Sequence, residues 1–248
     1  MLWARSLLFM LGMTVSAVIF APLALLTFPL PLKQRFRFIS LWARLNIWWL
    51  GITCRLYFRV EGREHIPPGP AIVLCKHQSA WETLVLQQLL PPQVWLLKRE
   101  LLWLPFFGWG LAMTRPIAID RKAGRRAIEQ LLEQGRQRLD DGMWVIIYPE
   151  GTRTAPGGKG RYAPGGALLA EHSAYPVLPV AHNAGEFWRR RGFIKYPGII
   201  TLVFGPVIDS AGRKAGDINS QAEQWIEMQM ARITTRPELY SHNATPAG

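Results

Sequence analysis

Residues 75–83, CKHQSAWET, combine a histidine and a carboxylate five positions apart, a pairing that could carry out acid–base chemistry. The apolar run 71–75 predicts a buried strand, and the leucines after the pair indicate a helix that ends at two prolines. His77 would therefore lie at the carboxyl end of a strand, where open α/β sheets usually bind ligands. Glu82 could face back toward the imidazole and orient it as a general base for a hydroxyl proton.

A second loop supports this interpretation, because a lone His–Glu pair at this spacing often arises by chance. Residues 149–154, PEGTRT, follow an apolar strand predicted at 143–148. A glycine, a threonine and an arginine after a buried strand can hold phosphate oxygens with backbone N–H groups and a guanidinium. Arg153 is the leading phosphate ligand, and Lys98 and Arg121 are secondary ones. The alternatives are a salt bridge for Arg153 and solvated surface charges for the other two.

Other catalytic motifs fit the sequence less well. Residues 158–160, GKG, are similar to part of a nucleotide-binding P-loop, but an arginine replaces the first glycine and a glycine replaces the Ser or Thr. No serine lies in a nucleophile elbow, and Cys75 is expected to be a buried strand thiol. His172 and His182 lack the spacing of a metal site, so we expect both to be structural and no metal to be bound.

Short apolar runs alternate with helix-like segments from residue 53 onward. Strands are expected at residues 54–60, 71–75, 94–98, 115–119, 143–148, 176–181 and 199–204. Helices are expected at residues 84–90, 122–139, 165–172 and 217–233. This alternation is typical of a single α/β domain with a central mixed, largely parallel sheet flanked by helices. We assign residues 53–236 to that domain and residues 237–248 to a polar C-terminal tail.

The amino-terminal part differs from the rest of the chain. Residues 6–32 contain no charged residue, and a bilayer takes about 20 apolar residues to span. Prolines in this segment indicate a helix that is kinked or ends early, so it could also lie within the membrane; a cleaved signal peptide is a further alternative. Aromatic and aliphatic residues at helical spacing in 36–52 favour an interfacial helix, with a core helix as the alternative. Residues 1–52 are therefore predicted to form a hydrophobic helical membrane anchor.

The composition points to an anionic partner. The formal charge of +12 fits nucleic acid, a phospholipid surface or a phosphate-bearing substrate. Eleven tryptophans, many near the amino terminus, favour a membrane interface. The basic residues are spread over predicted helix faces and loops without a nucleic-acid-binding module, so we expect no nucleic acid partner. The basic cluster after residue 32 places the bulk of the chain in the cytoplasm by the positive-inside rule.

Four blocks in order resemble the glycerolipid acyltransferase family. They are residues 77–82 (HQSAWE), 110–121, 148–154 (YPEGTRT) and 177–180 (VLPV). The resemblance implies a membrane-bound enzyme of the bacterial inner membrane, with its catalytic domain facing the cytoplasm. It implies transfer of a fatty acyl group from acyl-CoA or acyl carrier protein to the free hydroxyl of lysophosphatidate, without a metal or organic cofactor.

The resemblance also implies roles for individual residues. His77 is the general base and Glu82 orients it. The acceptor-binding loop comprises Glu150, Gly151 and Thr152. The acceptor phosphate is held by Arg153, Lys98 and Arg121.

Glu82 departs from the family pattern, which usually has aspartate at this position. A small backbone shift can absorb one additional methylene, so we expect activity to survive, although the acceptor could be another lysolipid. A non-catalytic protein that binds membrane lipid is the alternative from another class.

Overall fold

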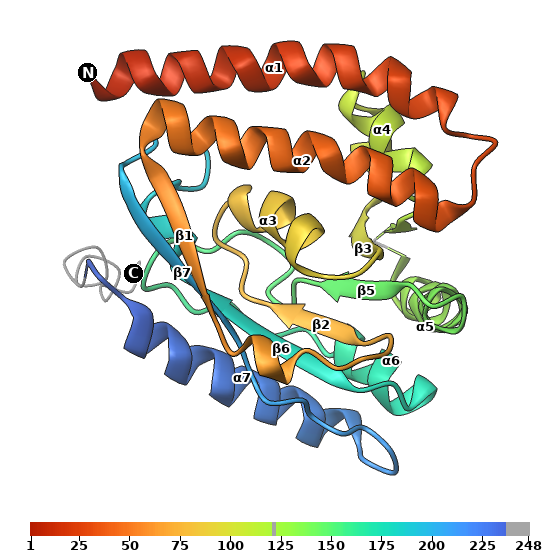
Figure 1. Ribbon diagram of the computed structural model, residues 1–248. Coiled ribbons are helices and arrows are strands. Elements are labelled where there is room, and N and C mark those ends of the chain that lie inside the picture. Colours follow the sequence, from red (N-terminus) through yellow and green to blue (C-terminus); the bar gives the residue numbers. More distant parts are fainter. Residues whose placement is uncertain (121–122, 237–248) are drawn as a thin grey trace.

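The computed structural model describes residues 1–120 and 123–236, which form one layered α/β structure around a seven-stranded sheet (Figure 1). The strands are β1 (Leu56–Glu61), β2 (Ile72–Cys75), β3 (Gln93–Lys98), β4 (Ile117–Ile119), β5 (Trp144–Ile147), β6 (Val177–His182) and β7 (Gly198–Phe204). Their order in space is β1-β7-β6-β2-β5-β3-β4, and only the β6–β7 pair is antiparallel. The prediction of a mixed, largely parallel sheet is confirmed. Arg121 and the predicted tail, residues 237–248, lie outside the described residues.

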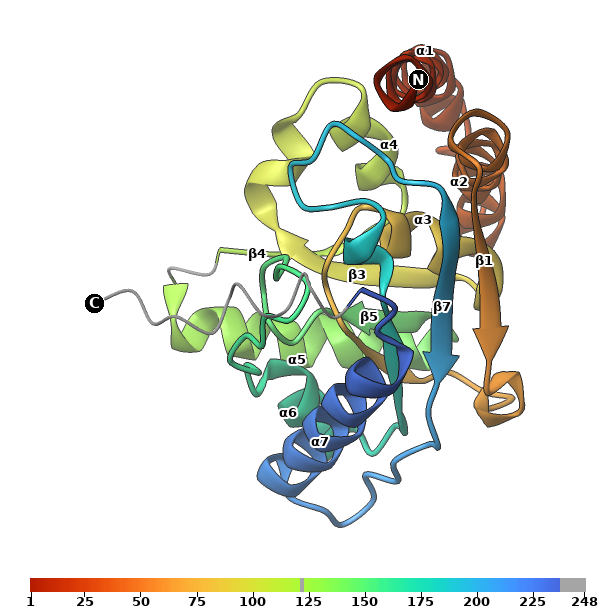
Figure 2. The same cartoon turned by 90° about the vertical axis from the view of Figure 1, so that its left-hand side faces the viewer.

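Helices cover both faces of the sheet (Figures 1 and 2). One face carries α5 (Arg125–Asp140), α6 (Gly165–Ser173) and α7 (Ala215–Ile233). The opposite side carries α1 (Leu2–Leu26), α2 (Leu32–Cys54), α3 (Trp81–Leu89) and α4 (Phe107–Met113). Three short 3₁₀ turns complete the described elements: η1 (Arg63–His65), η2 (Arg99–Trp103) and η4 (Ala184–Glu186).

Strand β2 lies at the centre of the sheet, between β5 and β6. Its four residues are fully buried, as expected for a parallel strand covered on both faces. Because side chains alternate along a strand, Ile72 and Leu74 pack with α5, α6 and α7, whereas Val73 and Cys75 pack with α2 and α3. The chain that leaves β2 is therefore anchored on both sides.

The first two helices form an antiparallel pair across the top of the domain (Figure 1). Helix α1 continues through Pro22 and ends at Leu26, before the prolines at 29 and 31. On α2, Ala43 and Leu50 join the core beneath, while Trp48 is 60% exposed on the outer side. Helix α2 therefore has both a core face, as the alternative interpretation expected, and an apolar outer face.

Candidate active site

The predicted pair lies in contact at the carboxyl end of β2. The Nδ1 atom of His77 is 2.8 Å from Oε1 of Glu82, which lies in the first turn of α3. Trp81 fixes the start of that helix. Its indole is buried edge-on against Phe58, and its backbone N–H donates a hydrogen bond to the Ser79 hydroxyl. The five-residue spacing thus turns the chain back as the sequence predicts.

The surroundings of Glu82 determine which nitrogen of the His77 imidazole carries the proton. Oε1 also accepts hydrogen bonds from the N–H groups of Gln78, at 2.9 Å, and Ser79, at 2.8 Å. Burial opposes ionisation of this carboxyl group, but the His182 and His77 side chains and the Ser79 N–H outweigh it and lower its pKa. A carboxylate held in this way accepts the Nδ1–H of His77, which leaves Nε2 as the basic nitrogen.

His182 lies behind the pair and is fully buried. Its Nε2–H donates to the carbonyl oxygen of Lys76 at 2.8 Å, and its Nδ1 accepts from the N–H of Ala184 at 3.2 Å. Burial lowers the pKa of this imidazole, which favours its neutral form. His182 therefore braces the backbone before His77, in line with its expected structural role.

Tyr148, at the end of β5, is a site residue that the sequence reasoning missed. Its ring stacks on the His77 imidazole with centroids 3.9 Å apart and planes 12° apart. The side chain is half-buried with its hydroxyl inside the protein, and burial of the phenol raises its pKa, so it is a neutral platform. Its position at the start of the block YPEGTRT, on the strand next to β2, is the signal that could have identified it.

His77 opens onto a cavity of about 460 Å³ between the N-terminal helices and the sheet. Apolar side chains that line it include Ala17, Phe20, Trp42, Leu84, Trp95 and Leu111. The polar and charged part of the lining, called the rim below, includes Lys98, Gly151, Thr152, Arg153, Arg190 and Arg191. In the described part of the chain, no Asp or Glu lines this cavity.

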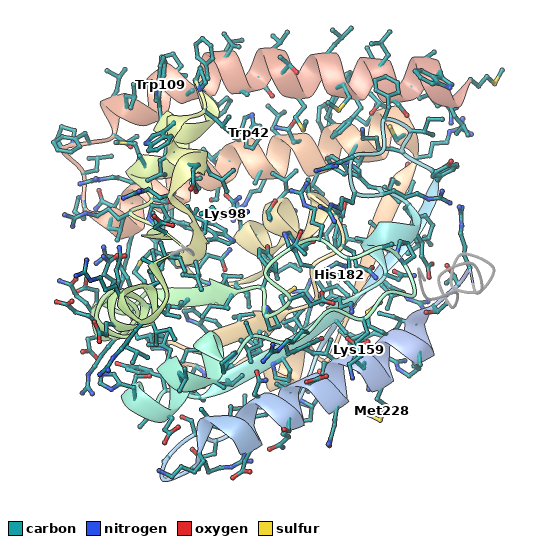
Figure 3. All side chains as sticks on the ribbon, turned by 180° about the vertical axis from the view of Figure 1, so that it is seen from behind. Trp42, Lys98, Trp109, Lys159, His182 and Met228 are labelled. Atoms are coloured by element: carbon teal, nitrogen blue, oxygen red, sulfur yellow. The ribbon has the colours of Figure 1, made fainter. Side chains whose placement is uncertain are left out.

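The predicted site residues are distributed unevenly around this cavity. Gly151, Thr152, Arg153 and Lys98 line it. Figure 3 shows Lys98 near Trp42 and α4, whereas Lys159 of the P-loop-like segment lies beside α7. The ammonium group of Lys159 is 2.8 Å from a carboxylate oxygen of Glu223, outside the cavity.

Glu150 points away from the cavity into the protein. Its Oε1 accepts from the ammonium group of Lys76 at 2.8 Å, and its Oε2 accepts from the N–H of His77 at 3.2 Å. Lys76 is 1% exposed and also donates to Glu227 on α7 at 2.8 Å. Thr154 completes the link, because its N–H donates to the His77 carbonyl at 2.8 Å. Glu150 therefore connects the loop to the base without lining the cavity.

Neither cysteine chemistry nor a metal centre is favoured by the geometry. Cys75 is fully buried, and burial with the nearby Glu82 and Glu150 carboxylates raises the pKa of its thiol, so the reactive thiolate is disfavoured. Among residues 1–120 and 123–236, no three His, Cys, Asp or Glu side chains form a group that could hold a metal ion. His172 lies exposed on α6.

Comparisons with known proteins extend this description. A family model described as acyltransferase matches residues 57–183. The chain is 42% identical to the 1-acyl-sn-glycerol-3-phosphate acyltransferase of Pseudomonas aeruginosa, over 96% of this chain and 95% of that protein. It is 27% identical to the 1-acyl-sn-glycerol-3-phosphate acyltransferase of Cocos nucifera, over 79% of this chain and 64% of that protein.

The fold is also similar to a solved structure. The crystal structure of the 1-acyl-sn-glycerophosphate acyltransferase PlsC from Thermotoga maritima superimposes with a TM-score of 0.77 at 20% identity. The match covers 99% of this chain and 97% of that one, so the N-terminal helices are included.

Proposed function

Because the chain belongs to the acyltransferase family, we propose that it transfers a fatty acyl group from a thioester to the free hydroxyl of lysophosphatidate, which makes phosphatidate. The observation that carries this proposal is the position of His77. An imidazole oriented by a buried carboxylate opens onto a cavity lined by apolar side chains and a cationic rim. Such a cavity suits an acceptor that carries both an acyl chain and a phosphate.

The chemistry proposed for His77 is general base catalysis. Its Nε2 removes the proton of the acceptor hydroxyl as that oxygen bonds to the thioester carbonyl carbon. The C–S bond then breaks, and the imidazolium returns the proton to the leaving thiolate. Glu82 stabilises the positive charge that the imidazole carries between these two steps. No residue of the chain is acylated, and the scheme requires neither a metal nor an organic cofactor.

Two features of the rim support binding of the acceptor phosphate. Gly151 has a left-handed backbone, with φ of 66°, at the turn that carries Thr152 and Arg153 into the rim. Lys98 contributes a second cation at the end of β3. A planar guanidinium and a mobile ammonium group together suit a phosphate monoester. The predicted contribution of Arg121 stays a prediction, since this residue lies outside the described residues.

Membrane association is supported by α1, which is long and apolar enough to cross a bilayer. Its outward residues at helical spacing include Leu7, Leu11, Val15, Ile19 and Leu23, each at least 41% exposed. The opposite face packs on α2 and α4. We propose that α1 and α2 lie in the cytoplasmic leaflet of the bacterial inner membrane, with the cavity opening where a lysolipid can enter from the bilayer.

The purified protein, incubated with lysophosphatidate and a labelled acyl thioester, provides the test. Acyl-CoA and acyl carrier protein are supplied in separate reactions, because both carry the required thioester. We expect phosphatidate from the parent protein and none above background from His77→Ala, which should still bind phospholipid vesicles. Full activity of His77→Ala would exclude the proposed base. Product only with a different lysolipid would retain the chemistry and change the acceptor, whereas vesicle binding without any transfer would favour a non-catalytic lipid-binding protein.

A further inference from the structure

The arginine turn, residues 189–192, brings two cations to the cavity that the proposed phosphate site does not use. Arg190 and Arg191 line the same rim as Arg153 and Lys98. Within the described residues, neither guanidinium lies within ion-pair distance of a carboxylate. Among the described residues, the one hydrogen bond that these two side chains make joins Arg190 Nη1 to the carbonyl oxygen of Arg153, at 2.9 Å.

The backbone of the arginine turn is held in an unfavourable conformation. The N–H of Gly192 donates to the carbonyl oxygen of Arg189 at 2.9 Å, which closes the turn. Arg191 then has φ of 58°, in the left-handed region that favours glycine or asparagine. A long cationic side chain therefore occupies a turn position where glycine or asparagine would be less strained, and such strain is concentrated at ligand sites.

The turn is also fixed against the rest of the protein. The N–H of Lys195 donates to the hydroxyl of Ser6 on α1 at 2.9 Å, and its ammonium group lies 5.0 Å from the centre of the Trp188 ring. Trp188 packs edge-on against Phe9, also on α1. The two arginines are thus presented by a braced segment between α1 and the loop at residues 149–154, called the phosphate loop below.

We propose that Arg190 and Arg191 form a second part of the acceptor-phosphate site, adjoining Arg153. This inference rests on the proposed function. A phosphate monoester carries nearly two negative charges and three acceptor oxygens, more than one guanidinium can pair. The phosphate of lysophosphatidate is separated from the reacting hydroxyl by the glycerol backbone alone, so it must stay near His77. The phosphates of both acyl donors lie at the far end of a long pantetheine arm, away from the reacting carbonyl.

The test is Arg191→Asn, because asparagine tolerates the left-handed backbone while it removes the charge. We expect the KM for lysophosphatidate to rise about tenfold, the scale of one lost charge-assisted contact from a side chain that is exposed in the free protein, with kcat changed little. Arg190→Gln should act in the same direction. The matched control is Arg189→Gln, which removes a charge from the same turn; Arg189 stacks on Tyr196 and does not line the cavity. This control should leave the KM unchanged.

Three further measurements separate the competing explanations. The KM values for acyl-CoA and acyl carrier protein should not change in Arg191→Asn; a rise there with an unchanged acceptor KM would assign the turn to the donor and overturn the inference. Weaker binding to vesicles of anionic phospholipid, again with an unchanged acceptor KM, would assign it to the membrane surface and overturn it equally. Calorimetric binding of a short-chain lysophosphatidate to His77→Ala, with and without Arg191→Asn, measures phosphate binding without turnover.

The two levels of proposal can fail separately. Turnover of lysophosphatidate by the parent protein tests the proposed function alone. If the parent protein acylates it and Arg191→Asn has the parent KM and the parent calorimetric affinity, the inference is wrong and the proposed function stands. If the parent protein neither acylates nor binds it, both proposals are wrong.

Discussion

Replacing Glu82 by glutamine separates two contributions of this side chain, because the structure dictates how the amide must lie. The N–H groups of Gln78 and Ser79 both point at Oε1, so the amide oxygen must occupy that place and continue to accept the Nδ1–H of His77. The NH₂ group then takes the place of Oε2, which has no hydrogen-bond partner among the described residues. The glutamine variant therefore preserves the orientation of the imidazole and removes the charge, and it places a donor 3.8 Å from Nε2 of His182, which makes the control for folding essential.

The expected loss follows from that difference. A hydrogen bond to a charged group contributes roughly 1.5–3 kcal/mol and a neutral one about 1 kcal/mol, so the transition state loses about 0.5–2 kcal/mol. This corresponds to a fall in kcat of about 2–30-fold. Glu82→Ala also removes the group that fixes the tautomer and direction of the ring, so its kcat should fall on the order of 10³-fold.

The assay is the steady-state rate of phosphatidate formation at saturating acceptor, with thermal unfolding in the same detergent as the control for folding. The parent kcat in a folded Glu82→Gln protein would refute the claim that the carboxylate stabilises charge on His77. Equal losses in Glu82→Gln and Glu82→Ala, with both proteins folded, would refute the claim that orientation is a separate contribution.

The remaining predictions concern the phosphate loop, the buried charges beneath it and the helix pair. Arg153→Ala should raise the KM for lysophosphatidate at least tenfold with a smaller effect on kcat, since its guanidinium lies at the rim; an unchanged KM in steady-state assays would remove it from the phosphate site. Lys76→Met should lower the free energy of unfolding by about 3–5 kcal/mol, because it leaves the buried Glu150 carboxylate without its cation. In denaturant titrations, the double variant Lys76→Met with Glu150→Gln should recover part of that loss. Gly12→Leu should lower the Tm, at a cost of about 1–3 kcal/mol, because a side chain there collides with the Trp49 indole; a parent Tm would show that α1 can move away from α2 freely.

Local patterns predicted most of the fold. Each of the seven expected strands is present, and the boundaries differ by a few residues at most. Apolar runs bounded by turn residues are strong signals for central parallel strands, because these strands are buried on both faces. The pattern did not specify which strands would be neighbours, and that depends on long-range packing. The position of β6 between β7 and β2 is one example.

The site was predictable where its members are close in sequence and less so where they are not. His77 and Glu82 belong to one turn, and their contact follows from a short chain segment. Tyr148 begins the block at residues 148–154, but its stacking on His77 depends on β5 lying beside β2, which the sequence did not specify. The turn at Arg191 reaches the cavity only through loop packing and carried no comparable signal. Glu150 illustrates the opposite difficulty. The loop that contains it was identified from the sequence, but the pattern could not show that its carboxylate faces inward to Lys76.

That inward carboxylate explains how two loops far apart in sequence act as one unit. Glu150 accepts the N–H of His77, and the N–H of Thr154 donates to the His77 carbonyl, so both sides of the base are tied to the phosphate loop. Arg153 lies within the tied segment, which sets the distance between the proposed phosphate ligand and Nε2 of His77. A reacting hydroxyl must lie within a fraction of an ångström of the position from which the base can take its proton. The distance from Arg153 to the base therefore selects the hydroxyl by its separation from the phosphate. We therefore expect selection of the acceptor hydroxyl to depend on the buried network of Lys76 and Glu150, although neither side chain lines the cavity.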